Sequence, residues 1–433
     1  MVEGAPLLRA YGPKAHRGFE SLSLRHFSRS ARACAALLAL LAAAPVQADE
    51  ALEHAKAVLE RSILFDGHND LPWAIREYKA APGDVAAYDL RAHAPGEGQT
   101  DIPRLRAGRV SAQFWSVYTP PEAEGHFART QLEQIDIARR LIARYPDTFQ
   151  LAGTAADIRA AKATGRIGSM LGLEGGHAIE DSLGALRAYY DLGVRYMTLT
   201  HNRHTHWADS AMQEPPAYGG LNAYGEQVVH EMNRIGMLVD LSHTAPDTMR
   251  DAIRVSQAPV IFSHAAARAL CEIPRNVPDD VLAMLPKNGG VIMVTFVSGF
   301  ISQDAADVLL PMLQEYLVRA EGKSEAERAA IYAEIQAKTM MPKVTIAAVA
   351  DHIEYIRKMI GVDYIGIGSD YDGNENWPEG LSDVSMYPNL FAELVRRGWS
   401  DEDLAKIAGG NVLRVLEQAE AVARRLQQET PPN

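Results

Sequence analysis

The chain has 433 residues, of which 47% are hydrophobic and 23% are charged, and its formal net charge is −12 at pH 7. This composition is that of a soluble globular protein with ample apolar material for a core, which excludes an intrinsically disordered chain. The acidic balance argues against a general affinity for nucleic acid or anionic lipid, because each of these partners favours a basic face. A small-molecule substrate fits this composition better.

Residues 1–48 have the pattern of a secretory signal peptide. The segment contains six Lys/Arg and two Glu, and the Ala/Leu run Ala33–Ala44 is too short to span a bilayer. The small residues around Ala48 predict cleavage after it, which would take the net charge from −12 to −16. A buried N-terminal helix is the alternative. We therefore predict an exported protein, periplasmic or secreted, whose residues 49–433 form one soluble domain.

Eight short runs rich in Val, Ile, Leu and aromatic residues follow, separated by stretches with helical periodicity. The predicted strands are Ser62–His68, Val110–Tyr118, Ile167–Glu174, Val194–His201, Met237–His243, Pro259–His264, Gly290–Val297 and Tyr364–Asp370. The predicted helices include Thr130–Tyr145, Ser182–Asp191, Tyr224–Ile235, Val344–Ile360 and Asp401–Leu426. Near-continuous hydrophobicity is typical of parallel strands covered on both faces, so the alternation predicts an α/β fold.

A (β/α)8 barrel and a doubly wound open sheet share this local pattern. Most runs end in an ionisable side chain, namely His68, Glu174, His201, His243, His264 and Asp370. In a barrel the carboxyl ends of the strands converge on one face, where active sites lie, whereas an open sheet spreads them along an edge. We therefore predict a TIM-type barrel. The long connections Pro72–Arg109 and Ser302–Pro342 predict loops and helices inserted at that face, although the second could be a solvated excursion.

The ligand types at the strand ends predict a metal centre. His68 and Asp70 lie two residues apart in a strand, so both can face the barrel interior. Imidazole and carboxylate groups are good zinc ligands, and Glu174 could bridge two ions with one oxygen each. His68 and Asp70 would then hold one Zn²⁺, and His243 and His264 the other. Each histidine could instead be a core residue with backbone partners, but five such coincidences at strand ends are improbable.

Two further side chains at the strand ends are candidates for catalysis. Asp370 follows the eighth run and is predicted to take a proton from a metal-activated water and to pass it to the leaving amine. His201 follows the fourth run and is predicted to hydrogen-bond the substrate carbonyl and the oxyanion that replaces it. Either residue could instead be a further metal ligand, and the residue pattern leaves both alternatives open.

The predicted site residues and the segments around them resemble those of the membrane (renal) dipeptidase family of the amidohydrolase superfamily. The matching segments are Phe65–Pro72, Glu174–His177, Thr198–His201, Asp240–His243, Phe262–His264, Arg275–Asp279 and Gly366–Gly373. Their order and spacing cover essentially the whole chain from about Leu59 to Glu417. The resemblance implies a zinc metallopeptidase that hydrolyses dipeptides and forms a homodimer.

Carried over by position, the resemblance implies the same roles for the metal and catalytic residues. His68, Asp70 and Glu174 bind one zinc ion, and Glu174, His243 and His264 bind the other. His201 contacts the scissile carbonyl, and Asp370 is the proton shuttle. The resemblance adds Arg275 as the partner of the substrate's C-terminal carboxylate, which a planar guanidinium can grip with two parallel hydrogen bonds. Without the family, Arg275 would be interpreted as a surface ion-pair residue.

The chain also departs from the family pattern. Animal members carry a lipid anchor near the C-terminus, which requires a hydrophobic tail, whereas this chain ends in the polar segment Arg424–Asn433. We therefore expect no membrane anchor. The seventh run continues Thr295–Phe300, where an aromatic side chain near the substrate is expected in the animal enzymes. Outside the predicted centre, His204, His206 and His352 are interpreted as loop or structural residues, and His177 as either a support for a metal ligand or a packing residue.

The principal hypothesis is a dinuclear zinc dipeptidase in which a metal-bridging hydroxide attacks the peptide carbonyl, with possible activity on dipeptides that end in a D-residue. One alternative keeps the metals but changes the substrate to another amide, a lactone or a phosphotriester. Many relatives of that kind bridge their metals with a modified Lys at the fourth strand, whereas here that strand ends in His201. A second alternative is a catalytically silent binding or maturation protein, which predicts a missing ligand or shuttle, and none is missing.

Overall fold

The computed structural model describes residues 49–92, 98–121 and 127–429, and the predicted signal peptide lies outside them. The described strands are β1 (Leu64–Asn69), β2 (Val110–Tyr118), β3 (Phe149–Leu151), β4 (Ile167–Glu174), β5 (Val194–Thr198), β6 (Leu238–Asp240), β7 (Ile261–Ala265), β8 (Val291–Val294) and β9 (Ile365–Ile367). Each of the eight predicted runs overlaps one of these strands, and β1 and β7 extend one residue beyond their runs. The three-residue strand β3 was not predicted.

The strands form one parallel sheet in the order β2-β1-β9-β8-β7-β6-β5-β4-β3. An additional pairing joins β2 to β4, from Ala112↔Gly168 to Tyr118↔Glu174, and closes eight of the strands into a barrel. The short strand β3 pairs with β4 outside this ring. The predicted (β/α)8 barrel is therefore confirmed, and the carboxyl ends of its strands meet at one face.

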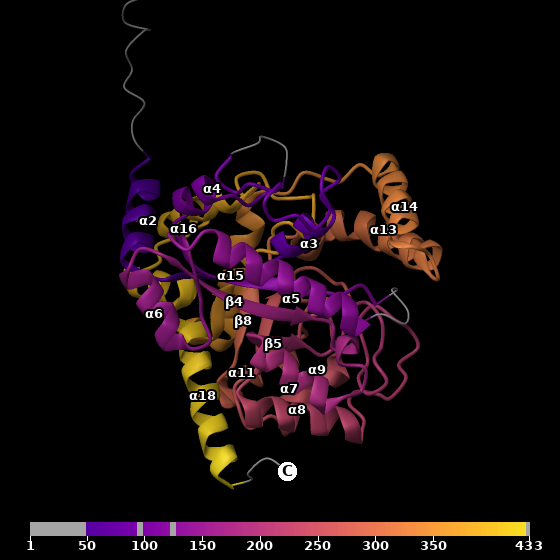
Figure 1. The fold of residues 1–433 in the computed structure, drawn as a ribbon. Coiled ribbons are helices and arrows are strands. Elements are labelled where there is room, and N and C mark those ends of the chain that lie inside the picture. The colour runs from indigo at the N-terminus through magenta and orange to yellow at the C-terminus, as the bar shows by residue number, and fades with distance from the viewer. Residues whose placement is uncertain (1–48, 93–97, 122–126, 430–433) are drawn as a thin grey trace, which may run out of the picture. The chain divides into compact units, whose positions relative to one another are not determined.

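Helices flank the barrel between successive strands (Figure 1). The longer ones are α2 (Glu50–Arg61), α5 (Phe127–Arg144), α6 (Ala155–Ala163), α7 (Leu183–Asp191), α8 (Ala223–Ile235), α9 (Pro246–Val255), α13 (Gln303–Ala320), α14 (Glu325–Lys338), α15 (Ile346–Ile360), α16 (Tyr387–Arg396) and α18 (Asn411–Glu429). Among the described residues, no helix combines the length and the apolar character that crossing a membrane requires.

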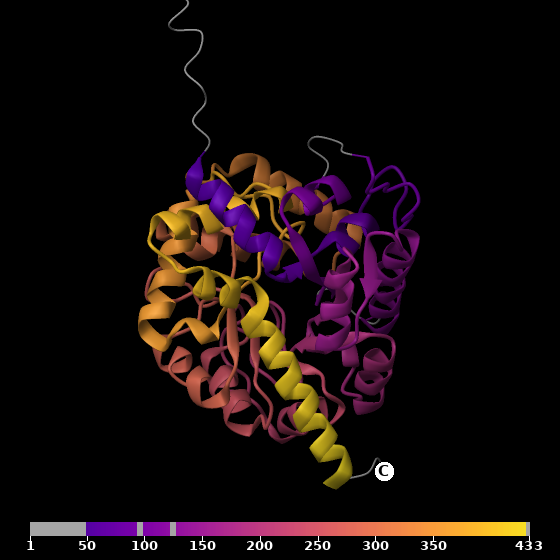
Figure 2. The same cartoon turned by 90° about the vertical axis from the view of Figure 1, so that its left-hand side faces the viewer.

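Alternation along the strands divides the core into an inner and an outer set of side chains. Phe114 and Tyr196 join one buried cluster, whereas their neighbours Trp115 and Met197 join another. This division follows from the pleat, which points successive side chains to opposite faces of a strand. Helix α18 runs along one side of the barrel (Figure 2) and contributes Val412 to the cluster of Phe114 and Tyr196.

The predicted C-terminal helix Asp401–Leu426 is interrupted in the structure. It divides into α17 (Asp401–Ala405), a π-helical turn at Lys406–Gly410, and α18. At the turn, a Cβ atom on Gly409 would lie 2.3 Å from the carbonyl oxygen of Ile63, so only glycine allows this approach to the chain before β1. Helical periodicity continues across the turn, and for that reason the sequence predicted one helix.

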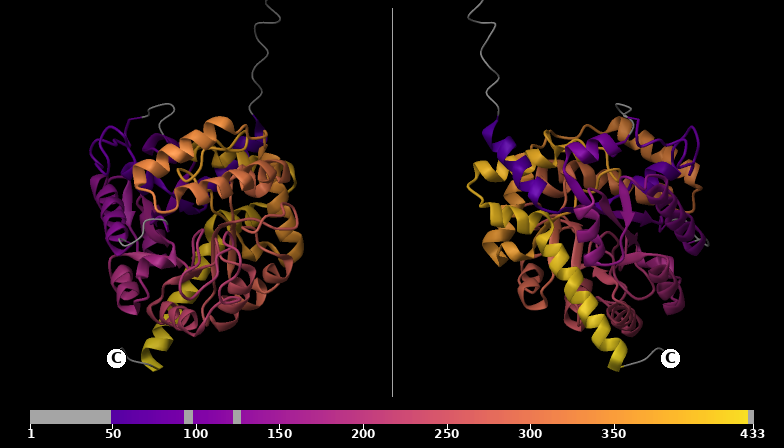
Figure 3. Two further views of the ribbon diagram at one scale, coloured as in Figure 1. Left: turned by 90° about the vertical axis from the view of Figure 1, so that its right-hand side faces the viewer. Right: turned by 60° about the vertical axis from the view of Figure 1, so that its left-hand side comes forward.

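Both long connections contain helices of their own. The first carries α3 (Leu71–Arg76) and α4 (Ile102–Ala107), and the second forms the α13–α14 hairpin. The hairpin lies across one end of the barrel in both views of Figure 3. Arg203, in the loop after β5, donates a hydrogen bond of 3.1 Å to the Leu317 carbonyl of α13, and Gln336 of α14 bonds Glu375 beyond β9. The second connection is therefore tied to loops that follow the strand ends.

Candidate metal centre

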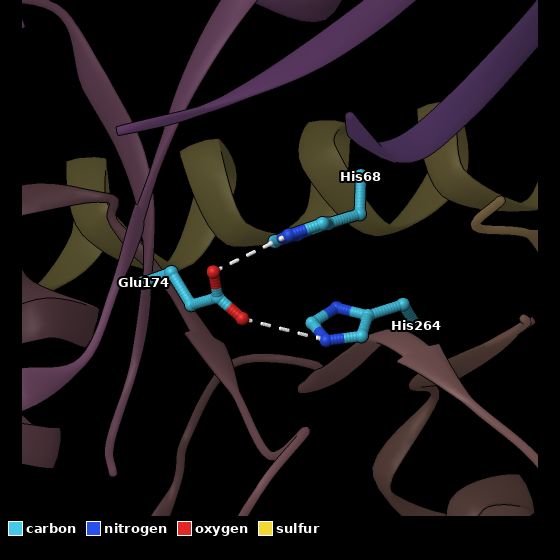
Figure 4. A group of neighbouring side chains, drawn as sticks. All are labelled: His68, Glu174 and His264. Atoms are coloured by element: carbon cyan, nitrogen blue, oxygen red, sulfur yellow. Dashed lines mark ion pairs between the residues drawn. The ribbon is translucent and has the colours of Figure 1, made fainter. Parts of the chain in front are cut away.

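The structure brings together the ionisable side chains predicted at the strand ends. Potential metal-binding atoms lie within 4.8 Å of one another in three groups, which share members. The groups are His68, Glu174 and His264; Glu174, His201 and His243; and His68, Asp70 and Asp370. Glu174 belongs to two groups and His68 to two, so the three groups form one continuous site. Figure 4 shows the first of them.

Glu174, the last residue of β4, lies at the middle of the site and directs its two oxygens to different partners. Its Oε2 atom is 3.5 Å from Nε2 of His68. Its Oε1 atom is 3.1 Å from Nε2 of His243 and 3.5 Å from Nε2 of His264, and Nε2 of His201 is 3.8 Å away. The two oxygens therefore face two different sets of nitrogen atoms.

Asp70 and Asp370 lie on the His68 side of the site. Nε2 of His68 is 3.2 Å from Asp70 Oδ2 and 3.9 Å from Asp370 Oδ1. A Cβ atom on Gly373 would lie 2.3 Å from Asp70 Oδ2 and 2.7 Å from Asp370 Oδ1, so the glycine leaves room for both carboxylates. His243 and Asp370 both have positive φ angles, of 66° and 71°. Such strained backbone is typical of functional sites.

In each of the three imidazoles predicted as metal ligands, the nitrogen that points away from Glu174 has a polar partner. His68 Nδ1 lies 2.7 Å from the Tyr196 hydroxyl, and His264 Nδ1 lies 2.8 Å from Ser263 Oγ. His243 Nδ1 lies 3.2 Å from Asn202 Oδ1. These partners orient the rings so that every Nε2 atom faces Glu174. None of the three partners was predicted from the sequence, because they are polar residues of common types whose role depends on the register between strands.

Gly172 in β4 makes room for the Tyr196 ring, and this gives a testable expectation. A Cβ atom on Gly172 would lie 2.0 Å from Tyr196 Cζ, so in Gly172→Ala the ring must move away. We expect the free energy of unfolding in urea to fall by about 1–3 kcal/mol, as in other overpacked cores. The matched control is Gly184→Ala in α7, where the atom nearest to the added Cβ is Ser182 Oγ at 3.4 Å. The free energy of unfolding of this variant should rise by up to about 1 kcal/mol. Equal stability of the two variants would contradict the steric argument.

The donor set fits divalent metal ions. His68 Nε2 and Asp70 Oδ1 are buried and have no hydrogen-bond partner among the described residues. Such orphaned polar atoms are costly unless another group satisfies them. Asp70, Glu174 and Asp370 place three carboxylates at the site, and neutral imidazole nitrogens complete a mixture of N and O donors that suits zinc. A cation at this position would satisfy the orphaned atoms and balance the carboxylates.

The pKa shifts of the site residues also fit the binding of a cation. Burial, together with the charge of nearby Arg275, lowers the pKa values of His243 and His264 well below the usual range. Both imidazoles are therefore neutral, which is the form that binds metals. Burial also raises the pKa of Glu174 and raises that of Asp370 well above its usual value, the latter with help from Asp70 and Glu174.

The pKa of His68 shifts in the opposite direction from those of His243 and His264. Burial opposes its charged form, but Tyr196 and the carboxylates of Asp70 and Glu174 raise its pKa well above the usual value. The surroundings of His68 thus favour a positive charge next to its ring. A divalent cation held by the same carboxylates would supply that charge in place of a proton.

Arg275 is almost fully buried, with 1% of its surface exposed, so it is not the surface ion-pair residue that the pattern would suggest without the family. Its Nη2 donates a hydrogen bond of 2.9 Å to the His264 carbonyl, and its guanidinium carbon lies 5.3 Å from the centroid of the Phe300 ring. Nε and Nη1 have no hydrogen-bond partner among the described residues. Burial lowers the pKa of Arg275 to about 10, so it remains a cation at neutral pH. Two donors of a buried cation are thus available to an anion.

His201 lies beside the predicted ligands. Its ring stacks on that of His243 with centroids 4.3 Å apart, and it also approaches the Tyr118 ring at 4.8 Å. Burial lowers its pKa well below the usual value, and the charges of His177 and Arg275 add to this effect. Its Nε2 atom is farther from Glu174 Oε1 than that of His243, at 3.8 Å against 3.1 Å. Because His201 also forms a potential metal-binding group with Glu174 and His243, its position is compatible with a metal ligand as well as with a substrate contact.

The other histidines singled out in the sequence have partners elsewhere. His177 bonds the Thr119 carbonyl at 2.8 Å and packs edge-on against Phe127. His352 lies 3.3 Å from the Ile301 carbonyl and accepts the Ala267 N–H. His206 is exposed and pairs with Asp181, and His204 lies 3.5 Å from Asp209. These contacts support packing for His177 and structural or loop roles for the rest.

Comparison with known proteins shows which family this chain resembles. The model of the membrane dipeptidase family (Peptidase family M19) matches residues 52–430. Dipeptidase 3 of Rattus norvegicus is 41% identical over 384 residues, which is 88% of this chain and 70% of that protein. Dipeptidase aclJ of Aspergillus oryzae is also 41% identical over 384 residues, which is 86% of this chain and 82% of that protein.

Solved structures show the same relationship. The probable dipeptidase PvdM of Pseudomonas aeruginosa superposes with a TM-score of 0.73 and 26% identity, covering 86% of this chain and 99% of that one. The metallopeptidase dipeptidase AC superposes with a TM-score of 0.66 and 25% identity, covering 83% of this chain and 98% of that one. The resemblance drawn from the sequence is thus confirmed, and the chain belongs to the membrane dipeptidase family, Peptidase family M19, as a metallopeptidase.

Proposed function

We propose that this chain is a dinuclear zinc dipeptidase whose reaction takes place at the centre around Glu174. The observation that carries the proposal is the division of the Glu174 oxygens between His68 on one side and His243 and His264 on the other. A carboxylate in this position can bridge two ions. Zinc bound here would lower the pKa of a coordinated water and polarise the scissile carbonyl.

The proposed ligands divide between the two ions. His68, Asp70 and Glu174 would hold one ion, and Glu174, His243 and His264 would hold the other. Support comes from the orphaned atoms His68 Nε2 and Asp70 Oδ1 and from the neutral state of the His243 and His264 imidazoles. Membership in a metallopeptidase family agrees with this assignment.

Asp370 and His201 are the proposed catalytic partners. The Asp370 carboxylate accepts a proton from the attacking water and delivers it to the leaving amine, because its raised pKa makes it a better proton carrier near neutral pH than an ordinary carboxyl group. His201 stabilises the oxyanion with an N–H donor, and it is held at the edge of the site by stacking on His243.

Arg275 is the proposed clamp for the substrate's free C-terminal carboxylate. Its unpartnered Nε and Nη1 atoms can donate two parallel hydrogen bonds, and burial strengthens a charge-assisted pair. This favours a dipeptide over a lactone or phosphotriester, which would leave both donors unpaired. Because the clamp grips the carboxylate and not the side chain, we propose that dipeptides with a C-terminal D-residue are also substrates.

Stepwise restoration of zinc to the metal-free protein tests the two-metal assignment. We expect hydrolysis of a free L,L-dipeptide to be absent without metal, because the carbonyl and the attacking water would not be activated. Activity should rise with added zinc and reach its plateau at two equivalents per chain, as bound metal counted by atomic absorption also reaches two. A plateau at one equivalent, with one ion bound, would reject the dinuclear assignment and leave a mononuclear enzyme.

A further inference from the structure

The carboxylate of Asp240, at the end of β6, lies behind the proposed metal centre and accepts four hydrogen bonds. Oδ1 accepts the backbone N–H groups of Ser263 at 2.8 Å and Ser242 at 3.2 Å. Oδ2 accepts the hydroxyls of Ser263 and Thr198, each at 2.6 Å. Asp240 and its three partners Ser242, Ser263 and Thr198 are all completely buried. The carboxylate thus holds both the backbone and the side chain of Ser263, the residue that precedes His264.

Strand pairing explains why a side chain is needed here. The ladder between β6 and β7 pairs Asp240 with Ile261 and does not reach Ser263. Oδ1 of Asp240 therefore takes the place of a backbone carbonyl and keeps the Ser263 N–H paired inside the barrel. The position of His264 on β7 depends on this contact, and the His264 N–H is held as well, by Ser242 Oγ at 3.0 Å.

The hydrogen-bond geometry also determines which nitrogen of His264 carries a hydrogen. Ser263 Oγ lies 2.6 Å from Asp240 Oδ2, 2.8 Å from His264 Nδ1 and 3.2 Å from Ser242 Oγ. A carboxylate that accepts four hydrogen bonds has no hydrogen to give, so the Ser263 hydroxyl donates to Asp240 and its oxygen accepts the Nδ1–H of His264. Nε2 of His264 then carries a lone pair, and it lies 3.0 Å from His243 Nε2, which can donate to it, and 3.5 Å from Glu174 Oε1.

We propose that Asp240 is a positioning residue, which acts through Ser263 to fix His264 in the Nδ1–H tautomer with its Nε2 lone pair directed into the site. The proposal rests on the proposed function in so far as that lone pair binds zinc. The other two imidazoles are held differently, by the phenol of Tyr196 and the amide of Asn202, and within the described residues neither of these groups is hydrogen-bonded to a carboxylate. His264 alone of the three is oriented through a hydroxyl and a buried anion.

The tautomer of His264 can be observed without metal or activity. In metal-free protein labelled with ¹⁵N-histidine, long-range ¹H–¹⁵N spectra distinguish Nδ1–H from Nε2–H, and a His264→Gln variant assigns the signal. We expect the pure Nδ1–H form in the native protein and a mixture of tautomers in Ser263→Ala, which removes the hydroxyl. A predominantly Nε2–H ring in the native protein, or no change in Ser263→Ala, would overturn the proposal.

Metal affinity gives the second measurement. In chelator competition we expect Ser263→Ala and Asp240→Asn to bind one of two zinc ions about 10–100-fold more weakly, as is usual when a partner of a metal-binding histidine is removed. The matched control is Thr198→Val, which removes a hydroxyl donor to the same Oδ2 atom without touching His264, and its affinity should stay within about 3-fold of native. Should Asp240→Asn fail to fold, Ser263→Ala still tests the hydrogen-bonded path from His264 through Ser263 to Asp240.

The outcomes separate this proposal from the proposed function. Equal weakening in Ser263→Ala and Thr198→Val would show a general packing effect and overturn the positioning role. Native zinc affinity in Ser263→Ala would overturn it as well. If native protein binds no zinc at all but His264 holds the Nδ1–H tautomer only when Ser263 is present, the proposed function fails while the orientation of His264 by Asp240 and Ser263 stands.

Discussion

Glu174→Gln should lower kcat for dipeptide hydrolysis by on the order of 10³-fold, since a neutral amide cannot bridge two cations. The lost stabilisation of charge in the transition state is worth several kcal/mol, and about 4 kcal/mol corresponds to that factor. Bound zinc should fall below two ions per chain in the same preparation. The matched control is Glu133→Gln on α5, a partly exposed carboxylate paired with Arg76 and Arg129, which should keep native activity.

The stability of the Glu174 variant distinguishes a lost ligand from a damaged fold. Burial raises the pKa of Glu174, which shows that its charge is costly in the absence of metal. The isosteric amide removes that cost, so the metal-free variant should unfold at a temperature equal to or above that of the metal-free native protein. A variant that retains two zinc ions and native kcat would contradict the central place of Glu174.

Arg275→Met should lower kcat/KM for free dipeptides by about 30-fold to several thousand-fold. Truncating one partner of a buried, hydrogen-bonded charge pair costs about 2–5 kcal/mol or more, which is the basis of that range. The loss should be confined to substrates with a free C-terminal carboxylate, so the weak hydrolysis of a C-terminal amide should change little. Arg275→Lys should fall between the native protein and Arg275→Met, because it keeps the charge but not the planar fork.

A control separates this effect from a general loss of positive charge. Arg250 is a partly exposed arginine that pairs with Asp247 and Asp280, and Arg250→Met should leave kcat/KM unchanged. An equal fall for the free dipeptide and its amide in Arg275→Met would indicate that Arg275 supports the His264 carbonyl rather than the substrate carboxylate.

The strand ends were predictable from sequence because parallel strands leave a simple signal. Buried on both faces, they appear as continuous apolar runs, and the first ionisable residue beyond each run marks the open end of the barrel. That signal was sufficient to bring His68, Glu174, His243 and His264 together. The family resemblance added Arg275, for which no local pattern exists.

Other features depend on contacts that local patterns do not carry. Tyr196 is one of several aromatic residues in an apolar run, and its contact with His68 depends on how β5 faces β1 across the barrel interior. The hydrogen bonds that connect His264 through Ser263 to Asp240 depend on the register between β6 and β7. The break at Gly409 results from the approach of the Ile63 carbonyl, which lies far away in sequence. Each feature is tertiary in origin, and the sequence could not predict it.

The most direct test of the account is a comparison of free dipeptides with their C-terminal amides, using zinc-loaded protein and L,L and L,D pairs. We predict that the free dipeptides are cleaved, that activity disappears when the metal is removed and returns with zinc, and that blocking the C-terminus lowers kcat/KM by at least about 30-fold. Zinc-loaded protein that cleaves no dipeptide, or that cleaves amides as well as free dipeptides, would contradict the proposed substrate and the role of Arg275.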